Sequence, residues 1–154
     1  MRETERIADQ LKRAFEKDAW HGPSVLENLQ GITAEQAQAK PINGAHGIWE
    51  IVLHISGWMK VAVPRMQGIK TSQPEEGDWP AIKNATVTGW NQTLEEMQRN
   101  YDELMAAISK LSDEDLTKPV FEIPDYNYVL LHRIIQHNLY HAGQMAVLRK
   151  AISQ

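Results

Sequence analysis

A polar interruption in an otherwise apolar helical stripe constrains the fold of this chain more than any other feature. The stripe advances by four and three residues in turn, which keeps its members on one side of an α-helix. Its members are Leu130, Ile134, His137, His141, Gln144 and Leu148. Because a helix turns by about 100° per residue, His137 and His141 lie about 40° apart on the side that faces the core.

Two imidazole rings in a core need partners, because an unpaired polar group is costly to bury. A metal ion held by both rings is one solution. Hydrogen bonds to neighbouring groups in an ordinary core are the other. The four-residue spacing of His137 and His141 leaves both interpretations open.

Three further stretches carry apolar residues at helical spacing, so the sequence predicts four long helices. We expect them at about residues 3–19, 47–67, 86–111 and 125–152, with short helical turns at 24–31 and 34–39. Pro64 should kink the second long helix or end it early. Ser24 with Glu27, and Ser112 with Asp115, have the spacing of helix caps.

The segments between these helices are expected to be irregular. Residues 68–85 contain several glycines and prolines and predict a long loop, in which Trp79 can fold over the bundle. Residues 120–124 predict an extended segment, and no stretch predicts a convincing strand. The sequence therefore indicates one all-α domain over residues 1–154, a four-helix bundle with long crossover loops and short extra helices.

Composition excludes several classes of function. The net charge is −4 and no basic patch stands out, which argues against binding to nucleic acid. No apolar run reaches the roughly 18 residues of a membrane span, and the charged N-terminus lacks the apolar region of a signal peptide, so we expect a cytoplasmic protein. The absence of cysteine excludes disulfides, thiolate ligands and a cysteine nucleophile.

His54 extends the candidate site to a second helix. It lies within an apolar stripe of the second predicted helix, as the histidine pair does in the last. Three neutral imidazoles with a solvent molecule resemble an open catalytic zinc site, although imidazole also suits nickel, iron and copper. His132 is about 140° around the helix from His137 and should lie at the surface. His21 and His46 fall in predicted loops, and His46 either caps the second helix or approaches the site.

These residues resemble the DinB-like superfamily, which includes the proteins called DinB and YfiT. The similarity rests on Ile51-Val52-Leu53-His54-Ile55 and on His137-x-x-x-His141-x-Gly143-Gln144, and it covers nearly the whole chain. It implies a four-helix bundle, often a homodimer, with one divalent metal held by His54, His137 and His141. Relatives with known activity use small thiols such as bacillithiol, mycothiol or glutathione, and others are described as candidate metal-dependent hydrolases.

The resemblance therefore implies a metal-dependent enzyme that activates water or a low-molecular-weight thiol, for hydrolysis or S-transfer on a small molecule. Zinc is the expected metal, with nickel or iron as alternatives. Because the chain has no cysteine, the sulfur in a thiol transfer must come from a cosubstrate. Glu50 is a candidate general base or partner of a ligand, and Gln144 a candidate partner of a ligand or of bound water. A solvated glutamate and a polar interface residue are the ordinary alternatives.

A non-catalytic protein is the competing interpretation. In it, a metal or a histidine network stabilises a dimeric bundle with a structural or stress-response role, and the core around the histidines is filled. An enzyme should instead have a cavity beside His54. DNA binding is suggested only by the damage-inducible name of the family, and the net charge of −4 argues against it. A di-iron centre is disfavoured because residues 125–152 contain no glutamate.

Overall fold

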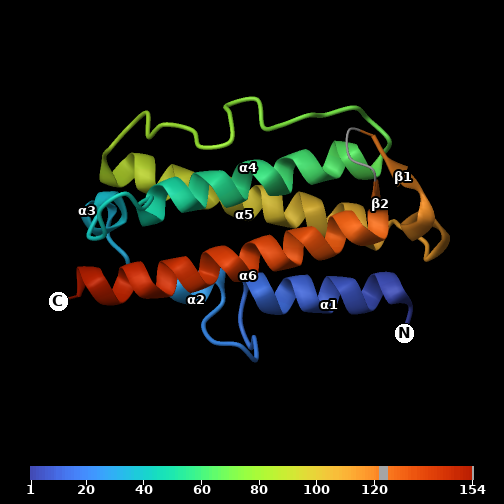
Figure 1. Ribbon diagram of the computed structural model, residues 1–154, viewed down its shortest axis with the longest axis horizontal. Helices are drawn as coiled ribbons and strands as arrows, with labels where there is room; N and C mark the ends of the chain where they lie inside the picture. The colour runs from blue at the N-terminus through green and yellow to red at the C-terminus, as the bar shows by residue number, and fades with distance from the viewer. Residues whose placement is uncertain (122–124, 154) are drawn as a thin grey trace.

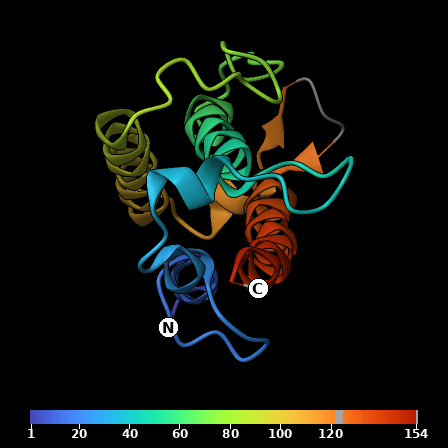
Figure 2. The same ribbon diagram turned by 90° about the vertical axis from the view of Figure 1, so that its left-hand side faces the viewer.

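Four long helices form a bundle in the computed structural model, which describes residues 1–121 and 125–153 (Figure 2). They are α1 (Glu3–Phe15), α4 (Ile48–Met66), α5 (Val87–Ser109) and α6 (Asn127–Ile152). The short helices α2 (Val25–Leu29) and α3 (Ala34–Gln38) connect α1 to α4. Between α5 and α6 lie the 3₁₀ helix η1 (Glu114–Thr117) and the strands β1 (Pro119–Val120) and β2 (Asp125–Tyr126). The predicted all-α bundle is confirmed.

The long loop between α4 and α5 follows from the direction of these two helices. They pack side by side and run the same way along the bundle (Figure 1). The chain must therefore return along the whole length of α4, about 28 Å for its 19 residues, before α5 can begin. Residues 67–86 make this crossing over the outer side of α4, as the sequence predicts for residues 68–85.

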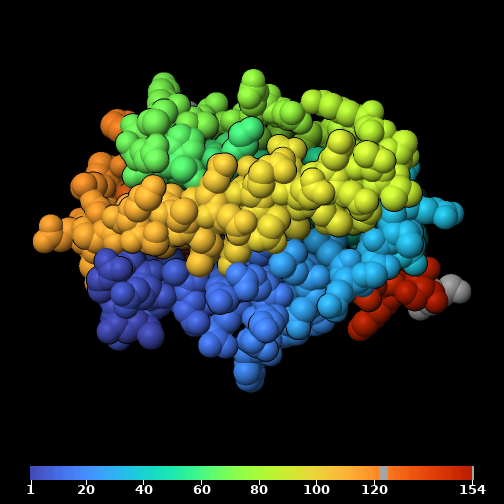
Figure 3. All heavy atoms as spheres, turned by 180° about the vertical axis from the view of Figure 1, so that it is seen from behind, coloured from blue at the N-terminus to red at the C-terminus, as the bar shows by residue number. Residues whose placement is uncertain are grey.

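The core lies on the axis of the bundle, where the apolar faces of the four helices meet. Seen from behind, α5 fills the face between this long loop and the segment from α1 to α3 (Figure 3). On α6 two stripes are buried, one more than the sequence analysis identified. The second stripe consists of Leu131, Ile135, Asn138, Ala142 and Met145.

The predicted end of α1 is wrong by about four residues. The helix ends at Phe15 rather than near residue 19, and Asp18 adopts a left-handed φ of 64° that a continuing helix does not allow. The hydroxyl of Ser24 donates to the carbonyl of Glu16 at 2.7 Å, which satisfies one carbonyl at the helix end. Ser24 also caps α2, with the reciprocal bonds to Glu27 that the spacing predicts.

Pro64 does not end α4 early. The helix continues to Met66, since the fixed φ of proline is compatible with a helix and only its own amide donor is lost. The chain leaves the helix at Gly68, whose φ of 76° suits glycine. There the amide of Ile69 donates to the carbonyl of Pro64 at 2.9 Å.

The expectation of no strands is also wrong, though only for two residues on each side. Val120 pairs with Asp125 in an antiparallel ladder, and Pro119 pairs with Tyr126. A ladder this short leaves no period-two pattern for a sequence reader to detect. Residues 120 and 121 are the described part of the expected extended segment, and 122–124 lie outside the described residues.

Gly89, an irregularity in the predicted stripe of α5, has a packing role. A Cβ atom at this position would lie 2.0 Å from the carbonyl oxygen of Asn84. Glycine therefore allows the end of the long loop to press against the first turn of α5, where Thr86 caps the helix through the amide of Gly89. Val87, which the pattern placed in the stripe, is 68% exposed.

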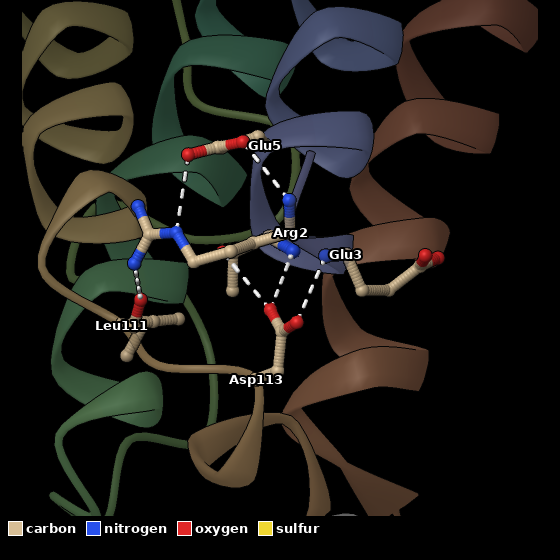
Figure 4. A network of polar contacts seen from close by, with 6 residues as sticks. Arg2, Glu3, Glu5, Leu111 and Asp113 are labelled. Atoms are coloured by element: carbon tan, nitrogen blue, oxygen red, sulfur yellow. Dashed lines mark hydrogen bonds and ion pairs between the residues drawn. The ribbon is translucent and has the colours of Figure 1, made fainter.

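The start of α1 is held by a carboxylate from the segment between α5 and η1 (Figure 4). Asp113 accepts hydrogen bonds from the backbone amides of Glu3 and Thr4, both at 3.0 Å. Arg2 donates to the carbonyl of Leu111 beside it at 3.4 Å. These amide bonds lower the pKa of Asp113, so the ionised carboxylate caps amides of the first turn of α1, in addition to the local bond from the Arg2 amide to Glu5.

Asn138 is a polar residue whose replacement should stabilise the fold. Its side chain is fully buried, and neither amide atom has a hydrogen-bond partner among the described residues. Because a buried unpaired amide costs about 1–3 kcal/mol, Asn138→Leu should raise the free energy of unfolding by about 1 kcal/mol, measured by urea denaturation. Asn28→Leu is the matched control and should destabilise the protein, since Asn28 donates to three backbone carbonyls. A loss of stability in Asn138→Leu would contradict the assignment.

Candidate metal centre

Three histidines from α4 and α6 meet inside the bundle. The Nε2 atom of His137 lies 2.8 Å from that of His54 and 3.1 Å from that of His141. One ligand atom from each ring lies within 4.8 Å of the others. For comparison, neighbouring nitrogen ligands around a tetrahedral zinc ion are separated by about 3.3 Å. The residues that the sequence proposed as a metal site are thus together, in an arrangement that could hold one ion.

Hydrogen bonds from the outer nitrogens fix two of the rings. The Nδ1–H of His54 donates to the backbone carbonyl of Asp78 at 2.6 Å. The Nδ1–H of His141 donates to Oε1 of Gln144 at 2.6 Å, one turn along α6. This contact is what the spacing predicted for Gln144. In metal sites, outer partners of this kind orient the ligating imidazoles and set which nitrogen faces the ion.

The proton inventory of the cluster favours a cation at its centre. A neutral imidazole has one N–H, so His54 and His141, which donate from Nδ1, each present a bare lone pair at Nε2. A proton on Nε2 of His137 can be donated in good geometry to only one of these two lone pairs. A divalent cation between the rings would accept all three lone pairs, and the donor set therefore fits a metal ion.

Burial keeps the rings of α6 neutral. Desolvation, followed by the proximity of His141 and His54, lowers the pKa of His137 to about 3. Desolvation also lowers the pKa of His141, although the hydrogen bond to Gln144 acts in the opposite direction. Near neutral pH both side chains therefore carry the lone pairs that a metal ion requires.

Trp79 and His46, from two different loops, form an aromatic stack on the cluster. The ring of Trp79 lies flat on His54, with centroids 3.9 Å apart and planes 4° apart. The ring of His46 lies on the other face of Trp79 at 3.6 Å. The sequence analysis allowed Trp79 to fold over the bundle, and His46 to approach the site, but it did not pair them. The stack shields one face of His54 from solvent.

Side chains of α4 hold the loop that carries Trp79 through hydrogen bonds. The carboxylate of Asp78 accepts a hydrogen bond from the indole of Trp58 at 2.8 Å. The guanidinium of Arg65 donates to the carbonyls of Thr71 and Ser72, at 2.8 and 2.5 Å. These contacts hold the backbone that meets His54. No sequence pattern predicts these contacts, because two of the acceptors are backbone carbonyls.

Cavities open on two sides of the histidines. One, of about 480 Å³, is lined by His54 and His137 together with Trp58, Arg65 and Arg133. The other, of about 630 Å³, is lined by His141 and Gln144 together with His46, Trp79 and Tyr140. The surroundings of the cluster are thus not a filled core.

Glu50 lies at the first turn of α4 and makes its contacts there. Its carboxylate accepts hydrogen bonds from Lys40 at 2.9 Å and from the amide of Gly47 at 2.8 Å, and His46 is 3.4 Å away. Burial raises the pKa of Glu50, but the bonds from Lys40 and Gly47 outweigh it and lower the pKa overall. These contacts are those of the solvated helix-start alternative, and through His46 they lead to the stack of Trp79 on His54.

His132 and His21 lie apart from the cluster. The ring of His132 donates to the carbonyl of Tyr128 at 2.9 Å and stacks on the Tyr128 ring at 4.2 Å. His21 is exposed in the loop between α1 and α2. Both positions agree with the sequence analysis, which assigned neither residue to the site.

A family comparison matches this arrangement of helices and histidines. The sequence profile described as the DinB superfamily matches residues 19–145, a span that includes all three histidines. The chain belongs to the DinB superfamily. No curated protein sequence matches it.

A solved structure supports the fold of this DinB superfamily member over its whole length. The crystal structure of a conserved protein from Enterococcus faecalis superposes with a TM-score of 0.74 and covers 99% of this chain and 98% of its own. At 15% identity the likeness concerns the fold alone. Within the described residues, no helix has the length and apolar character needed to cross a membrane.

Removal of the amide that orients His141 should weaken metal binding. Gln144→Leu deletes the acceptor of the Nδ1 proton, and loss of such an outer partner typically lowers metal affinity about 10- to 100-fold. Competition with a chromophoric chelator for zinc would measure the change. Gln136→Leu, an exposed glutamine on the same helix, is the control and should bind zinc as the parent does. Equal affinities for Gln144→Leu and the control would contradict the role of the hydrogen bond.

The neutral histidines should make the metal-free protein sensitive to acid. The pKa of His137 is about 3 in the folded chain, below the ordinary histidine value of about 6.5, so the unfolded chain binds the proton more tightly. This contribution to stability is complete above about pH 6.5 and is lost as the pH falls toward 3. After chelation, the free energy of unfolding should therefore decline between pH 7 and 4, by less than about 1.4 kcal/mol per pH unit for this partly exposed ring. His137→Gln should show a shallower decline, and an equal slope in both proteins would refute the argument.

Proposed function

We propose that this DinB superfamily protein is a metal-dependent enzyme, which uses an ion held by His54, His137 and His141 to activate water or a small thiol. The reaction is hydrolysis or S-transfer on a small molecule, and zinc is the favoured metal, with nickel or iron as alternatives. The observation that carries the proposal is the convergence of three Nε2 atoms between two cavities. Three protein ligands leave a coordination position for solvent or substrate.

The chain's own residues would prepare this centre in three ways. Asp78 and Gln144 hold His54 and His141 so that each turns its lone pair inward. Burial keeps the rings of α6 unprotonated near neutral pH. Trp79 excludes water from one face of His54. A bound divalent ion would supply Lewis acidity, which lowers the pKa of water or of a thiol in contact with it.

The two cavities differ in chemistry, which suits a reaction of two small molecules. The cavity beside His137 contains two guanidinium groups, of which Arg133 pairs with Asp125 at 2.6 Å. The cavity beside His141 has no arginine or lysine among its lining residues and includes Tyr140. Because the chain lacks cysteine, a thiol would enter one of these cavities as a cosubstrate.

The alternative is a protein in which metal or the histidine network only stabilises the bundle. It predicts close packing around the histidines, whereas His54 and His141 each line an open cavity. This comparison favours the enzyme. The homodimer implied by the family resemblance stays a prediction, which the mass in solution by light scattering would test.

Metal content is the first test of the proposal. Untagged protein should contain about one transition-metal ion per chain by elemental mass spectrometry, as expected for a mononuclear three-histidine site. His137→Ala should retain little metal, because it removes the ligand between the other two. His132→Ala is the matched control on the same helix and should retain the full content, since this ring bonds to Tyr128 away from the cluster.

Turnover then separates the enzyme from the structural alternative. Zinc-loaded protein should accelerate conjugation of a small thiol to an electrophile, or hydrolysis of an activated ester or amide, and His137→Ala should not. Metal bound at one ion per chain, with no turnover across such a panel and a large loss of stability after chelation, would support the structural alternative. Absence of metal even after reconstitution would overturn both metal-based interpretations.

A further inference from the structure

We propose a second ligand site, a cavity between α4 and α5 that binds a small organic amine. The cavity has a volume of about 260 Å³ and is roofed by residues 71–80 of the long loop. It shares no lining residue with the two cavities beside the histidines, because it lies against the other face of α4. The site is therefore independent of the proposed metal centre.

The floor of this cavity carries a buried amide with an unused acceptor. Asn100 on α5 is 7% exposed, and its Nδ2 donates to the hydroxyl of Ser56 at 2.8 Å and toward the Ser56 carbonyl at 3.4 Å. A carbonyl can only accept, which assigns Nδ2 to the side of Ser56 and leaves Oδ1 for another donor. Nothing in the described parts of the chain donates a hydrogen bond to Oδ1. This oxygen at the floor of the cavity can accept a hydrogen bond from a ligand that brings an N–H or O–H group.

The walls and the rim of the cavity indicate which other chemical groups the ligand should carry. The walls are apolar and consist of Leu53, Val61, Pro64, Pro74 and Pro80. Three carboxylates, Glu75, Glu76 and Glu96, stand at the exposed rim against a single lysine among the lining residues, Lys60. Lys83 pairs with Glu76 at 3.2 Å from outside the cavity. The rim of the cavity therefore carries a net negative charge, and the interior below it is apolar.

These three features together specify an amine with a compact apolar body. Its ammonium group would supply the N–H donors that the Asn100 acceptor lacks, and its charge would be attracted by the rim. Its hydrocarbon part would occupy the proline-rich walls. An anion of the same shape would meet the carboxylates and would find no cation other than Lys60 among the lining residues.

Benzylamine is a suitable probe, with benzyl alcohol and benzoate as the neutral and anionic matches. Titrated into ¹⁵N-labelled full-length protein, benzylamine should shift backbone amide resonances of residues 53–61, 73–76 and 93–100, and benzoate should not. Asn100→Leu, checked for fold by circular dichroism, should abolish these shifts because it removes the acceptor. No shifts with benzylamine, or the same shifts with benzoate, would overturn the site.

Two further variants keep the test sharp if Asn100→Leu fails to fold. Glu96→Lys reverses an exposed rim charge and should weaken benzylamine binding roughly fivefold at low ionic strength. Glu95→Lys makes the same change one residue earlier, outside the cavity, and should bind benzylamine within about twofold of the parent. Equal weakening in both would show attraction to overall charge and refute the site. His137→Ala should leave binding unchanged, whereas loss of binding there would place the amine at the histidines and overturn the proposal.

Discussion

The candidate site depends on two conditions at its three imidazole rings: hydrogen bonds that fix outer ring nitrogens, and rings that stay neutral inside the bundle. His54 meets the first condition through the carbonyl of Asp78, and His141 meets it through Gln144. Burial supplies the second, since it lowers the pKa of His137 and His141. The rest of the site follows from these requirements. The stacked Trp79 limits water, and the cavities give access to nitrogens that are already oriented.

The parallel course of α4 and α5 explains why an irregular segment completes the site. Two neighbouring helices that run the same way need a connection as long as the helix itself, and here it passes over α4. Its middle brings Asp78 and Trp79 onto His54. The buried prolines Pro74 and Pro80 of the same loop close the cavity between α4 and α5. One crossing thus contributes to both faces of α4, and the two proposed sites share a roof without sharing a lining residue.

Regular parts of the molecule could be predicted from the sequence, and contacts made by loops could not. Helical periodicity predicted the four long helices, and the same periodicity placed His54, His137 and His141 on inward faces. The position of Gln144 beside His141 followed from its three-residue spacing. The end of α1 was missed because it depends on a hydroxyl from Ser24, eight residues beyond Glu16. Such contacts have no period, and only the folded chain brings them together.

The stack of His46 on Trp79 was missed for the same reason, as was the buried amide of Asn138. Asn138 sits one residue from His137 and belongs to a second buried stripe that apolar neighbours define. The sequence analysis followed the stripe of α6 that contains His137 and His141 and did not identify the second one. A helix that is buried on two sides shows little difference in hydrophobicity between its faces, so a second buried stripe is hard to detect. The roles of the three histidines as metal ligands remain predictions that rest on geometry and donor chemistry.

The partner of His54 is a main-chain oxygen, and this choice has an evolutionary consequence. Every amino acid offers the same carbonyl, so the acceptor itself does not require a particular side chain at position 78, although the Asp78 carboxylate helps to hold the loop through Trp58. A deletion or insertion between Arg65 and Asp78 is different, because each residue moves an extended chain by about 3.5 Å and would carry the oxygen out of reach. Among homologues that keep the three histidines, conservation of this hydrogen bond should therefore appear as constant loop length, not as constant sequence.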